Sequence, residues 1–230
     1  RIREAGIVGM GGATFPTQVK LMPPAGKKAD TLIINAVECE PYLTSDHRLM
    51  LEKGKEIMIG IQLLMKATKV NRVIIGIESN KPDAIELMTT LSSRTMSVEV
   101  CPLKLKYPQG SEKQLIVATT GRELSSGQLP IDVGVIVQNV GTAYAVFEAI
   151  VKNKPLVERV VTVTGKSLKQ TKNLLVRVGT PMQFVLTDST KHFFRGSVYC
   201  NCIPNQDSLA PIYDYLKQDV RIIMESLEWR

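Results

Sequence analysis

The sequence predicts an α/β protein with a Rossmann-like, largely parallel sheet that carries helices on both faces, followed by a small α+β module. Short runs rich in β-branched apolar residues alternate with longer segments of helical periodicity. The runs are continuously apolar, as is typical of parallel strands that are covered on both faces. After about residue 155 the helices between the strands disappear, which predicts a first domain at 1–155 and a second at 156–230.

Four segments predict the first half of the sheet and its helices. A strand is expected at 31–35 (TLIIN), and a long helix at 48–69, where apolar residues recur at helical spacing. The second strand is expected at 72–77 (RVIIGI). Asn80 is the predicted N-cap of the next helix, which has Pro82 in its first turn and reaches Leu91.

The second half repeats this alternation. A third strand is expected at 97–101, and the segment 107–120 begins as a turn and becomes a helix. The fourth strand is expected at 132–138 (DVGVIVQ) and is followed by an apolar helix at 141–152. Because parallel sheets bind ligands outside the carboxyl ends of their strands, the loops at those ends are the candidate functional segments.

The predicted second module has a different pattern. Two short strands are expected at 159–164 (RVVTVT) and 173–178 (NLLVRV), and Thr180-Pro181 favours the start of a short helix. No period is evident over 192–204, and a helical period returns over 213–229.

The composition excludes several classes of protein. The 230 residues carry a formal net charge of +7, with 44% hydrophobic and 22% charged residues, as in an ordinary globular protein and unlike a disordered, collagen-like or disulfide-stapled chain. The longest apolar run, at about 57–65, is interrupted by Gly60 and Gln62, so no transmembrane segment is expected, while peripheral contact with a membrane stays open. The basic residues form no stripe and aromatic residues make up only 5%, so nucleic acid is not an expected partner.

The cysteines and the first residue bear on cellular context. Four scattered cysteines favour a reducing compartment over a disulfide framework. No signal-peptide pattern is recognised, and a sequence that begins with Arg1 is expected to be part of a longer gene product.

A glycine-rich segment near the N-terminus is the strongest local signal. Residues 6–17 (GIVGMGGATFPT) are followed by Lys20. Glycines let the backbone approach a ligand closely, and their amides can form an anion nest with a lysine nearby to balance a phosphate. The spacing differs from the dinucleotide fingerprint and from a nucleotide-triphosphatase loop, so by itself the segment is equally compatible with a flexible turn.

A second polar segment follows the first predicted strand. Residues 35–41 (NAVECEP) place an amide and two carboxylates where a parallel sheet contacts ligands. His47 and Asp46 are the nearest further metal-ligating residues, so a metal site is not expected. Cys39 is interpreted as a packed thiol, and the chain has only two histidines, which argues against hydrolytic Ser-His or Cys-His chemistry.

Taken together, these segments resemble a known family. The runs GIVGMGGATFPTQVKL and INAVECEPYLTSDHRLM resemble the C subunit of the Rnf electron-transport complex and, more distantly, the flavin-bearing, NADH-oxidising subunit of respiratory complex I. The segments YPQGSEKQL at 107–115 and LPIDVGVIVQNVGTAY at 129–144 agree and occur in the same order. The resemblance covers about 2–153, and 160–184 looks like the small ligand-binding β-grasp module that follows in this family.

The resemblance implies the roles of the first segment. In the family the glycine loop wraps FMN, so Gly9, Gly11 and Gly12 are expected along the flavin. Lys20 is expected near the FMN phosphate or ring, and Phe15 matches an aromatic residue that stacks near the nicotinamide dinucleotide.

The resemblance also implies roles for the three later segments. It places Asn35 and Glu38 at FMN and Glu40 at NADH, in the motif whose amide and carboxylates contact the ribityl chain and the dinucleotide. The expected FMN contacts of the third and fourth segments are Tyr107, Gly110, Glu112, Asn139 and Thr142.

Three positions depart from the complex I pattern. Val37 stands where that subunit has aspartate, Ser111 replaces the first of two adjacent glutamates, and Ala13-Thr14 replaces an Ala-Gly step. The loss of two polar contacts is expected to weaken flavin affinity or to alter the pose of the dinucleotide.

The resemblance implies the chemistry and the partners. A hydride passes between NADH and FMN, and electrons continue to two four-iron clusters, whose repeated cysteine motif this sequence lacks; Cys200-Asn-Cys202 is interpreted as non-metal. The expected partners are other subunits of a membrane complex and ferredoxin or an equivalent carrier, on the cytoplasmic side of a bacterial membrane. A related flavin-dependent corrinoid or amino-acid reductase protein, and a non-catalytic docking scaffold, remain alternatives.

Overall fold

A computed structural model of the chain describes residues 1–93, 97–165, 168, 170–180, 183–187 and 193–197. The predicted helix at 213–229 and the pair Cys200 and Cys202 lie outside the described residues.

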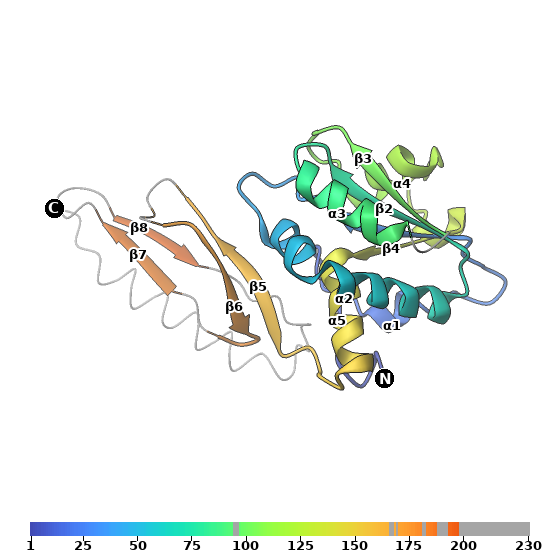
Figure 1. The fold of residues 1–230 in the computed structure, drawn as a ribbon, viewed down its shortest axis with the longest axis horizontal. Helices are drawn as coiled ribbons and strands as arrows, with labels where there is room; N and C mark the ends of the chain where they lie inside the picture. The colour runs from blue at the N-terminus through green and yellow to red at the C-terminus, as the bar shows by residue number, and fades with distance from the viewer. Residues whose placement is uncertain (94–96, 166–167, 169, 181–182, 188–192, 198–230) are drawn as a thin grey trace. The chain divides into compact units, whose positions relative to one another are not determined.

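Four parallel strands form the central sheet, as the sequence predicts (Figure 1). The strands are β1 (Thr31–Ala36), β2 (Arg72–Glu78), β3 (Val98–Leu103) and β4 (Val135–Asn139). Their spatial order is β3-β2-β1-β4, so the chain first builds the sheet to one side of β1 and then crosses to the other side. This reversal makes the boundary between the neighbouring strands β1 and β4 the topological switch point, where sheets of this kind bind ligands at the carboxyl ends of the strands.

Helices cover both faces of this sheet. The helices are α1 (Thr17–Lys20), α2 (Ser45–Thr68), α3 (Pro82–Ser92), α4 (Glu112–Thr120) and α5 (Val140–Val151), with a short 3-10 helix η1 at Pro130–Val133. The larger core cluster joins α2, α3 and α5 to one face, and the smaller one joins α4 to the other (Figure 1). Successive side chains of β1 point to opposite faces of the sheet. Leu32 and Ile34 therefore pack in the larger cluster, and Ile33 packs in the smaller one.

The two longest helices on the larger face approach each other closely. A Cβ atom added at Gly60 of α2 would lie 1.9 Å from the carbonyl oxygen of Ala143 in α5. Only glycine permits this contact, which brings the start of α5 against the body of the domain.

Several predicted boundaries need correction. Lys81, not Asn80, is the N-cap of α3, because a turn from Glu78 to Lys81 places Pro82 at the first helical position. The strand predicted at 132–138 begins only at Val135, because η1 ends at Gly134, whose φ of 75° interrupts an extended backbone.

The described C-terminal part consists of two antiparallel hairpins. β5 (Glu158–Val163) pairs with β6 (Lys172–Arg177), close to the predicted strands. β7 (Gln183–Thr187) pairs with β8 (Phe193–Ser197), so the helix predicted to start at Thr180-Pro181 was wrong, and a strand lies within 192–204, where no period was evident. The aromatic and β-branched residues of β7 fit a strand better than a helix. The division at residue 155 and the β-grasp assignment stay predictions.

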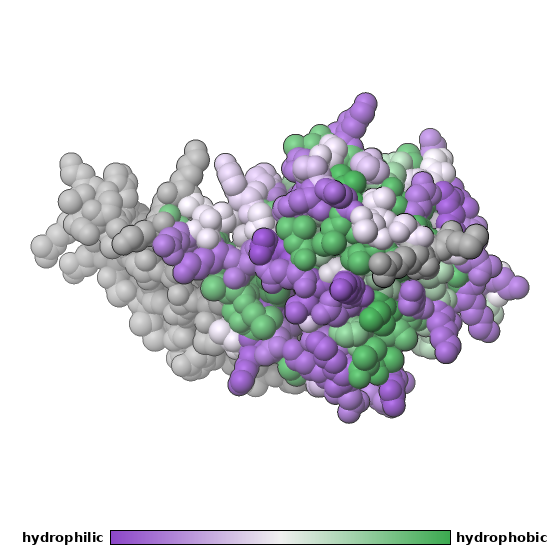
Figure 2. Space-filling view, in the orientation of Figure 1, coloured by the Kyte–Doolittle hydropathy of each residue, from purple (hydrophilic) through white to green (hydrophobic). Residues whose placement is uncertain are grey.

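The described residues on the face drawn in Figure 2 include both polar and apolar side chains. Figure 2 shows hydrophilic side chains spread between separate hydrophobic ones over the face that carries α2 and α3. Within the described ranges, no helix combines the length and apolar character that crossing a membrane requires.

Candidate functional site

The candidate site begins with two asparagines at the ends of neighbouring strands. Asn35 lies at the end of β1 and Asn139 closes β4, and the two residues are register partners in the parallel ladder. The Asn139 side-chain amide donates to the Asn35 carbonyl at 3.3 Å, and its oxygen accepts from the Gly141 amide as the N-cap of α5. Both asparagines therefore lie at the carboxyl edge, on the two sides of the switch point.

The glycine loop is fixed against this edge. The Gly9 amide donates to the Phe15 carbonyl at 2.8 Å, which closes the loop on itself. The Met10 amide donates to the Thr142 hydroxyl at 3.0 Å, which ties the loop to the first turn of α5. A Cβ atom added at Gly11 would lie 3.4 Å from the Asn139 side chain, so the loop backbone lies directly on that residue.

The third segment contacts the same edge through Gly110. The Asn35 amide donates to the Gly110 carbonyl at 2.9 Å, while the Asn35 oxygen accepts from the Val37 amide. A Cβ atom at Gly110 would lie 2.9 Å from the Val37 carbonyl and 3.1 Å from the Cys39 sulfur, so no larger residue fits without displacing the backbone. Glycine at this position lets two segments far apart in sequence lie in contact.

An ion pair joins the first segment to the third. Lys20 Nζ lies 2.6 Å from Glu112 Oε1 and donates to the Val137 carbonyl at 3.3 Å. The two side chains are 30% and 37% exposed, so the pair faces solvent. Phe15, Tyr107 and Glu40 are exposed.

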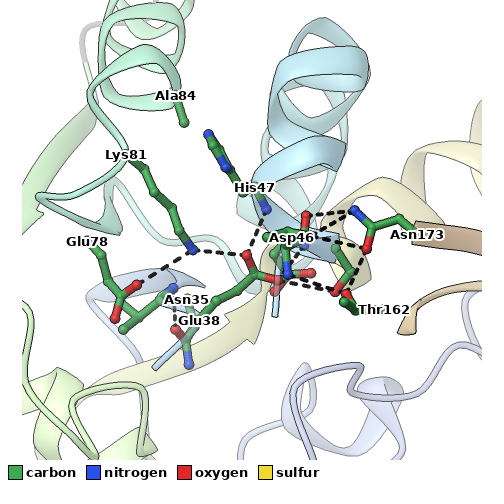
Figure 3. Close-up of polar contacts among 12 residues, drawn as sticks. Asn35, Glu38, Asp46, His47, Glu78, Lys81, Ala84, Thr162 and Asn173 are labelled. Carbon is green, nitrogen blue, oxygen red and sulfur yellow. Dashed lines mark hydrogen bonds and ion pairs between the residues drawn. The ribbon is translucent and has the colours of Figure 1, made fainter. Parts of the chain in front are cut away.

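Glu38 occupies a different environment (Figure 3). Its side chain is 4% exposed and accepts from the Lys81 ammonium at 2.9 Å and from the Asp46 and His47 amides at 2.7 and 3.1 Å. These amides belong to the first turn of α2, which lacks a side-chain cap from Thr44. Glu38 therefore supplies the missing cap, which explains why α2 begins three residues before its predicted start at 48.

Lys81 is the centre of a buried charge cluster that sequence reasoning missed. Its side chain is 7% exposed and lies between Glu38 and Glu78, whose Oε2 is 3.5 Å away (Figure 3). Glu78 is 1% exposed, its Oε1 has no hydrogen-bond partner among the described residues, and burial raises its pKa. A lysine in the sequence Asn-Lys-Pro carries no signal for such a role, because its partners come from the ends of two strands.

Asp46 connects this cluster to the switch point. Its Oδ2 accepts from the Asn139 amide at 2.7 Å. Burial and the adjacent Glu38 carboxylate raise the pKa of Asp46 to about 6, while the Asn139 hydrogen bond and the charges of Lys81 and Arg159 act in the opposite direction. The sequence analysis named Asp46 only as a nearby carboxylate where no metal site was expected, and its position beside Asn139 was not predicted.

The structure thus brings most of the predicted site residues together at one edge. Contacts link the glycine loop, Lys20, Asn35, Gly110, Glu112, Asn139 and Thr142. Glu38 is present at this edge but its carboxylate already has protein partners. No group of three or more His, Cys, Asp or Glu residues is placed to hold a metal ion in the part of the chain that the structure describes.

The structure describes the surroundings of two residues that depart from the complex I pattern, Val37 and Ser111. Val37 is 8% exposed and packs in the smaller core cluster with Ile33 and Leu115. Ser111 is exposed at the N-cap of α4 and makes no side-chain capping bond. Val37 therefore contributes to packing, and Ser111 leaves the helix start without a side-chain cap.

Comparison with known proteins places these features in a family. The family model of the Nuo51 FMN-binding domain matches residues 2–148. A second family model, that of the gliding motility lipoprotein GldD, matches residues 153–229, much of which lies outside the described residues.

Curated relatives match about four fifths of the chain. The C subunit of the proton-translocating ferredoxin:NAD(+) oxidoreductase complex of Clostridium ljungdahlii is 55% identical over 78% of this chain and 39% of its own length. The C subunit of the Na(+)-translocating complex of Acetobacterium woodii is 48% identical over 80% of this chain and 42% of its own. The C subunit of the ion-translocating oxidoreductase complex of Citrobacter koseri is 44% identical over 82% of this chain and 27% of its own. The chain thus spans less than half the length of these relatives.

A solved structure agrees with the fold. A chain of an NAD+-reducing [NiFe]-hydrogenase in the air-oxidised state superposes with a TM-score of 0.66 at 25% identity, over 78% of this chain and 36% of the other. With the family model matched over most of the chain and relatives 44% to 55% identical, the chain belongs to the Nuo51 FMN-binding domain family and is similar to the C subunits of the ion-translocating ferredoxin:NAD(+) oxidoreductases.

Proposed function

We propose that the chain is the NADH/FMN electron-entry module of a membrane-associated, Rnf-type electron-transport complex. In this proposal a hydride passes from NADH to FMN, or in the reverse direction. Membership of an FMN-binding family and the oxidoreductase names of its relatives support it. Because the chain spans 39% and 42% of the first two relatives, the activity of the whole complex belongs to the proposal.

The observation that carries the proposal is the meeting of four separate segments at the switch point between β1 and β4. The residues at that edge fit a flavin nucleotide. The backbone of Gly11 lies on Asn139, and a Cβ atom at Gly110 would meet the Val37 carbonyl, so the glycine segments pack directly against the strand ends. The amides, the lysine and the carboxylate gathered there are groups of the kind that bind a ribityl chain and a flavin ring.

The roles of individual residues follow from their positions. Asn35 and Asn139 are oriented by bonds to Gly110, Gly141 and Asp46, so their amides are held in place before a ligand arrives. Lys20 is held by Glu112 at the edge of the loop and would lie near the flavin ring. When bound, FMN accepts a hydride from a nicotinamide and returns electrons singly. The protein's contribution is then orientation, because correct placement of two reactants is itself a large part of catalysis.

The same proposal assigns the substrate and the partners. Phe15 and Glu40, which are exposed, would contact NADH. Electrons would continue to iron-sulfur clusters outside this segment and to ferredoxin or an equivalent carrier. The module would bind peripherally, with other subunits of the complex, at the cytoplasmic side of the membrane.

Two other functions remain as alternatives. A corrinoid or amino-acid reductase electron-transfer protein would use the same flavin site with another acceptor. A docking scaffold without catalysis is favoured by Val37, which packs in the core where the complex I subunit has aspartate. NADH oxidation assayed with several acceptors separates the first alternative from the main proposal.

Flavin binding and reduction test the proposal in two steps. FMN fluorescence is titrated with the protein, and the complex is then mixed anaerobically with NADH. We expect binding at micromolar FMN, followed by bleaching of the flavin absorbance. No binding by a protein with intact circular dichroism contradicts the flavin site, and binding without bleaching favours the scaffold.

A further inference from the structure

The described part of the chain after α5 contributes one side chain to the glycine loop. Arg159, in β5, donates a hydrogen bond from its Nη2 to the carbonyl oxygen of Met10. Arg159 is half-buried, and Met10 lies between Gly9 and Gly11 in the loop. The contact therefore places a guanidinium directly on the segment expected to wrap a nucleotide.

The hairpin that carries Arg159 is anchored beside the same edge. The Thr162 hydroxyl of β5 and the Asn173 side chain of β6 bond to Thr44, immediately before α2 (Figure 3). The Leu156 amide, just before β5, donates to the Ala5 carbonyl at 2.9 Å. With contacts on both sides, the position of Arg159 is set by several independent bonds.

Arg159 also differs from Lys20 in its charge balance. Lys20 has a carboxylate partner at 2.6 Å. Among the ion pairs of the described residues, none includes Arg159, and its hydrogen bond to Met10 ends on an uncharged carbonyl. Its charge influences Asp46, but that carboxylate is bonded to Asn139. A partly buried cation that forms no close ion pair within the described residues can still bind an anionic ligand.

We propose that Arg159 binds a phosphate group of the nucleotide held at the glycine loop. A guanidinium has five donors in a planar fork, so a hydrogen bond to Met10 leaves donors for phosphate oxygens. The inference rests on the proposed function for the identity of the nucleotide, and it makes β5 part of the cofactor site. Lys20, already paired with Glu112, then serves the flavin ring and not the phosphate.

Phosphate oxygens at this loop can come from two sources, the single phosphate of FMN or the diphosphate of NADH. The experiment uses the full chain as wild type, Arg159→Met, Arg159→Lys and the control Arg177→Met, an exposed arginine on β6. Binding of inorganic phosphate and pyrophosphate is measured by calorimetry. Binding of FMN and of riboflavin, which lacks the phosphate, is measured by flavin fluorescence, and NADH affinity by flavin reduction.

The expected result is a selective loss. Arg159→Met weakens binding of the phosphate-bearing ligand about 10- to 100-fold, the range for hydrogen bonds to a charged group, and leaves riboflavin binding unchanged. Arg159→Lys recovers part of the loss because it keeps the charge without the fork, and Arg177→Met has no effect. Loss for FMN identifies the flavin phosphate, and loss for NADH alone identifies the diphosphate.

Other outcomes overturn the assignment or separate it from the proposed function. Equal losses of FMN and riboflavin, or no loss for any ligand, show that Arg159 binds no phosphate. If circular dichroism shows that Arg159→Met does not fold, Arg159→Lys is the variant that tests the assignment. Wild-type affinities of Arg159→Lys for FMN, NADH and pyrophosphate would then contradict it. If wild-type protein binds pyrophosphate through Arg159 but binds no FMN, the phosphate site stands and the flavin function fails.

Discussion

Two lysine-glutamate pairs lie at the same edge of the sheet and differ mainly in their surroundings. Lys81 and Glu38, beside β1 and β2, are 2.9 Å apart, and their side chains are 7% and 4% exposed. Lys20 and Glu112, at the loop beside β4, are 2.6 Å apart, and their side chains are 30% and 37% exposed. The same kind of ion pair therefore occurs once in the interior and once near the surface.

The difference shows which part of the edge is available to a ligand. At the β2 side, Glu38 has four protein donors and Lys81 has two carboxylate neighbours, so the charges serve the fold. At the β4 side, the pair remains accessible next to a glycine loop with little side-chain volume. Burial, more than the separation of the charges, distinguishes a structural pair from one that can rearrange around a ligand.

The largest expected effect comes from removing the buried cation. Lys81→Met leaves Glu38 and Glu78 in the interior without their shared counter-charge. We expect a loss of about 3–5 kcal/mol in the free energy of unfolding, as is typical when one partner of a buried pair is removed. Equilibrium urea unfolding measures the loss.

The control is a lysine in a comparably short pair that is only partly buried. Lys154 lies 2.6 Å from Glu158, and their side chains are 36% and 28% exposed. Lys154→Met should cost less than about 1 kcal/mol. Equal losses for the two variants would contradict the view that burial separates the two kinds of pair.

The next prediction concerns the pH dependence of stability, because the buried cluster contains more carboxyl groups than cationic groups. The pKa of Asp46 is raised from 3.8 to about 6, so the folded protein binds this proton more tightly than the unfolded chain. Its contribution to stability is therefore greatest below pH 4 and is lost as the pH rises to about 6. Asp46→Asn should remove this dependence, on the order of 1–2 kcal/mol after allowance for partial exposure. Unfolding measured from pH 4 to pH 7 tests it.

Asp83 is the matched control because its pKa moves in the opposite direction. The His47 ring, 2.8 Å away, lowers the pKa of this exposed carboxyl. Asp83→Asn should therefore remove stability that is present above the ordinary pKa and lost as the pH falls. The same direction of change in both variants would disprove the assignment for Asp46.

Much of the fold could be predicted because the strands carry their signal locally. The continuous apolar runs of β1 and β2 indicate strands buried on both faces, and both lie within one residue of their predicted ends. The motif order also predicted that distant segments share one edge, since parallel strands end on the same side. Boundaries were less predictable where a turn intervenes, as at Gly134 before β4.

The buried charge cluster could not be predicted for a physical reason. Glu38 was expected at the cofactor, and its role as the cap of α2 depends on where the amide of Asp46 lies in space. Lys81 is polar and precedes a proline, which is typical of an exposed turn. Its burial is a consequence of two carboxylates that converge from β1 and β2, and such a tertiary contact leaves no periodic pattern.

The variant Lys20→Met tests whether the pair of Lys20 and Glu112 has a role in flavin binding. Lys20→Met should change stability by less than about 1 kcal/mol because about a third of each side chain of the pair is open to solvent. If Lys20 lies near the flavin ring, the variant should weaken FMN and riboflavin binding alike, by about tenfold, equivalent to about 1.4 kcal/mol. Flavin fluorescence titration measures both. A loss for FMN alone would place Lys20 at the phosphate and contradict the division of roles between Lys20 and Arg159.

The smallest expected effect comes from a single hydrogen bond within the buried cluster. The Ser45 hydroxyl donates to Glu38 at 3.2 Å, alongside the Lys81 ammonium and two backbone amides. Ser45→Ala leaves the charge balance intact. Because the bond is long and three other donors to Glu38 remain, the expected loss in urea unfolding is about 0.5–1 kcal/mol, below the range for a strong bond to a charged group. Ser93→Ala, which removes an exposed hydroxyl bond to Thr90, should cost less. A loss for Ser45→Ala as large as that for Lys81→Met would mean that saturation of Glu38 with hydrogen bonds, and not its buried counter-charge, determines the stability of this edge.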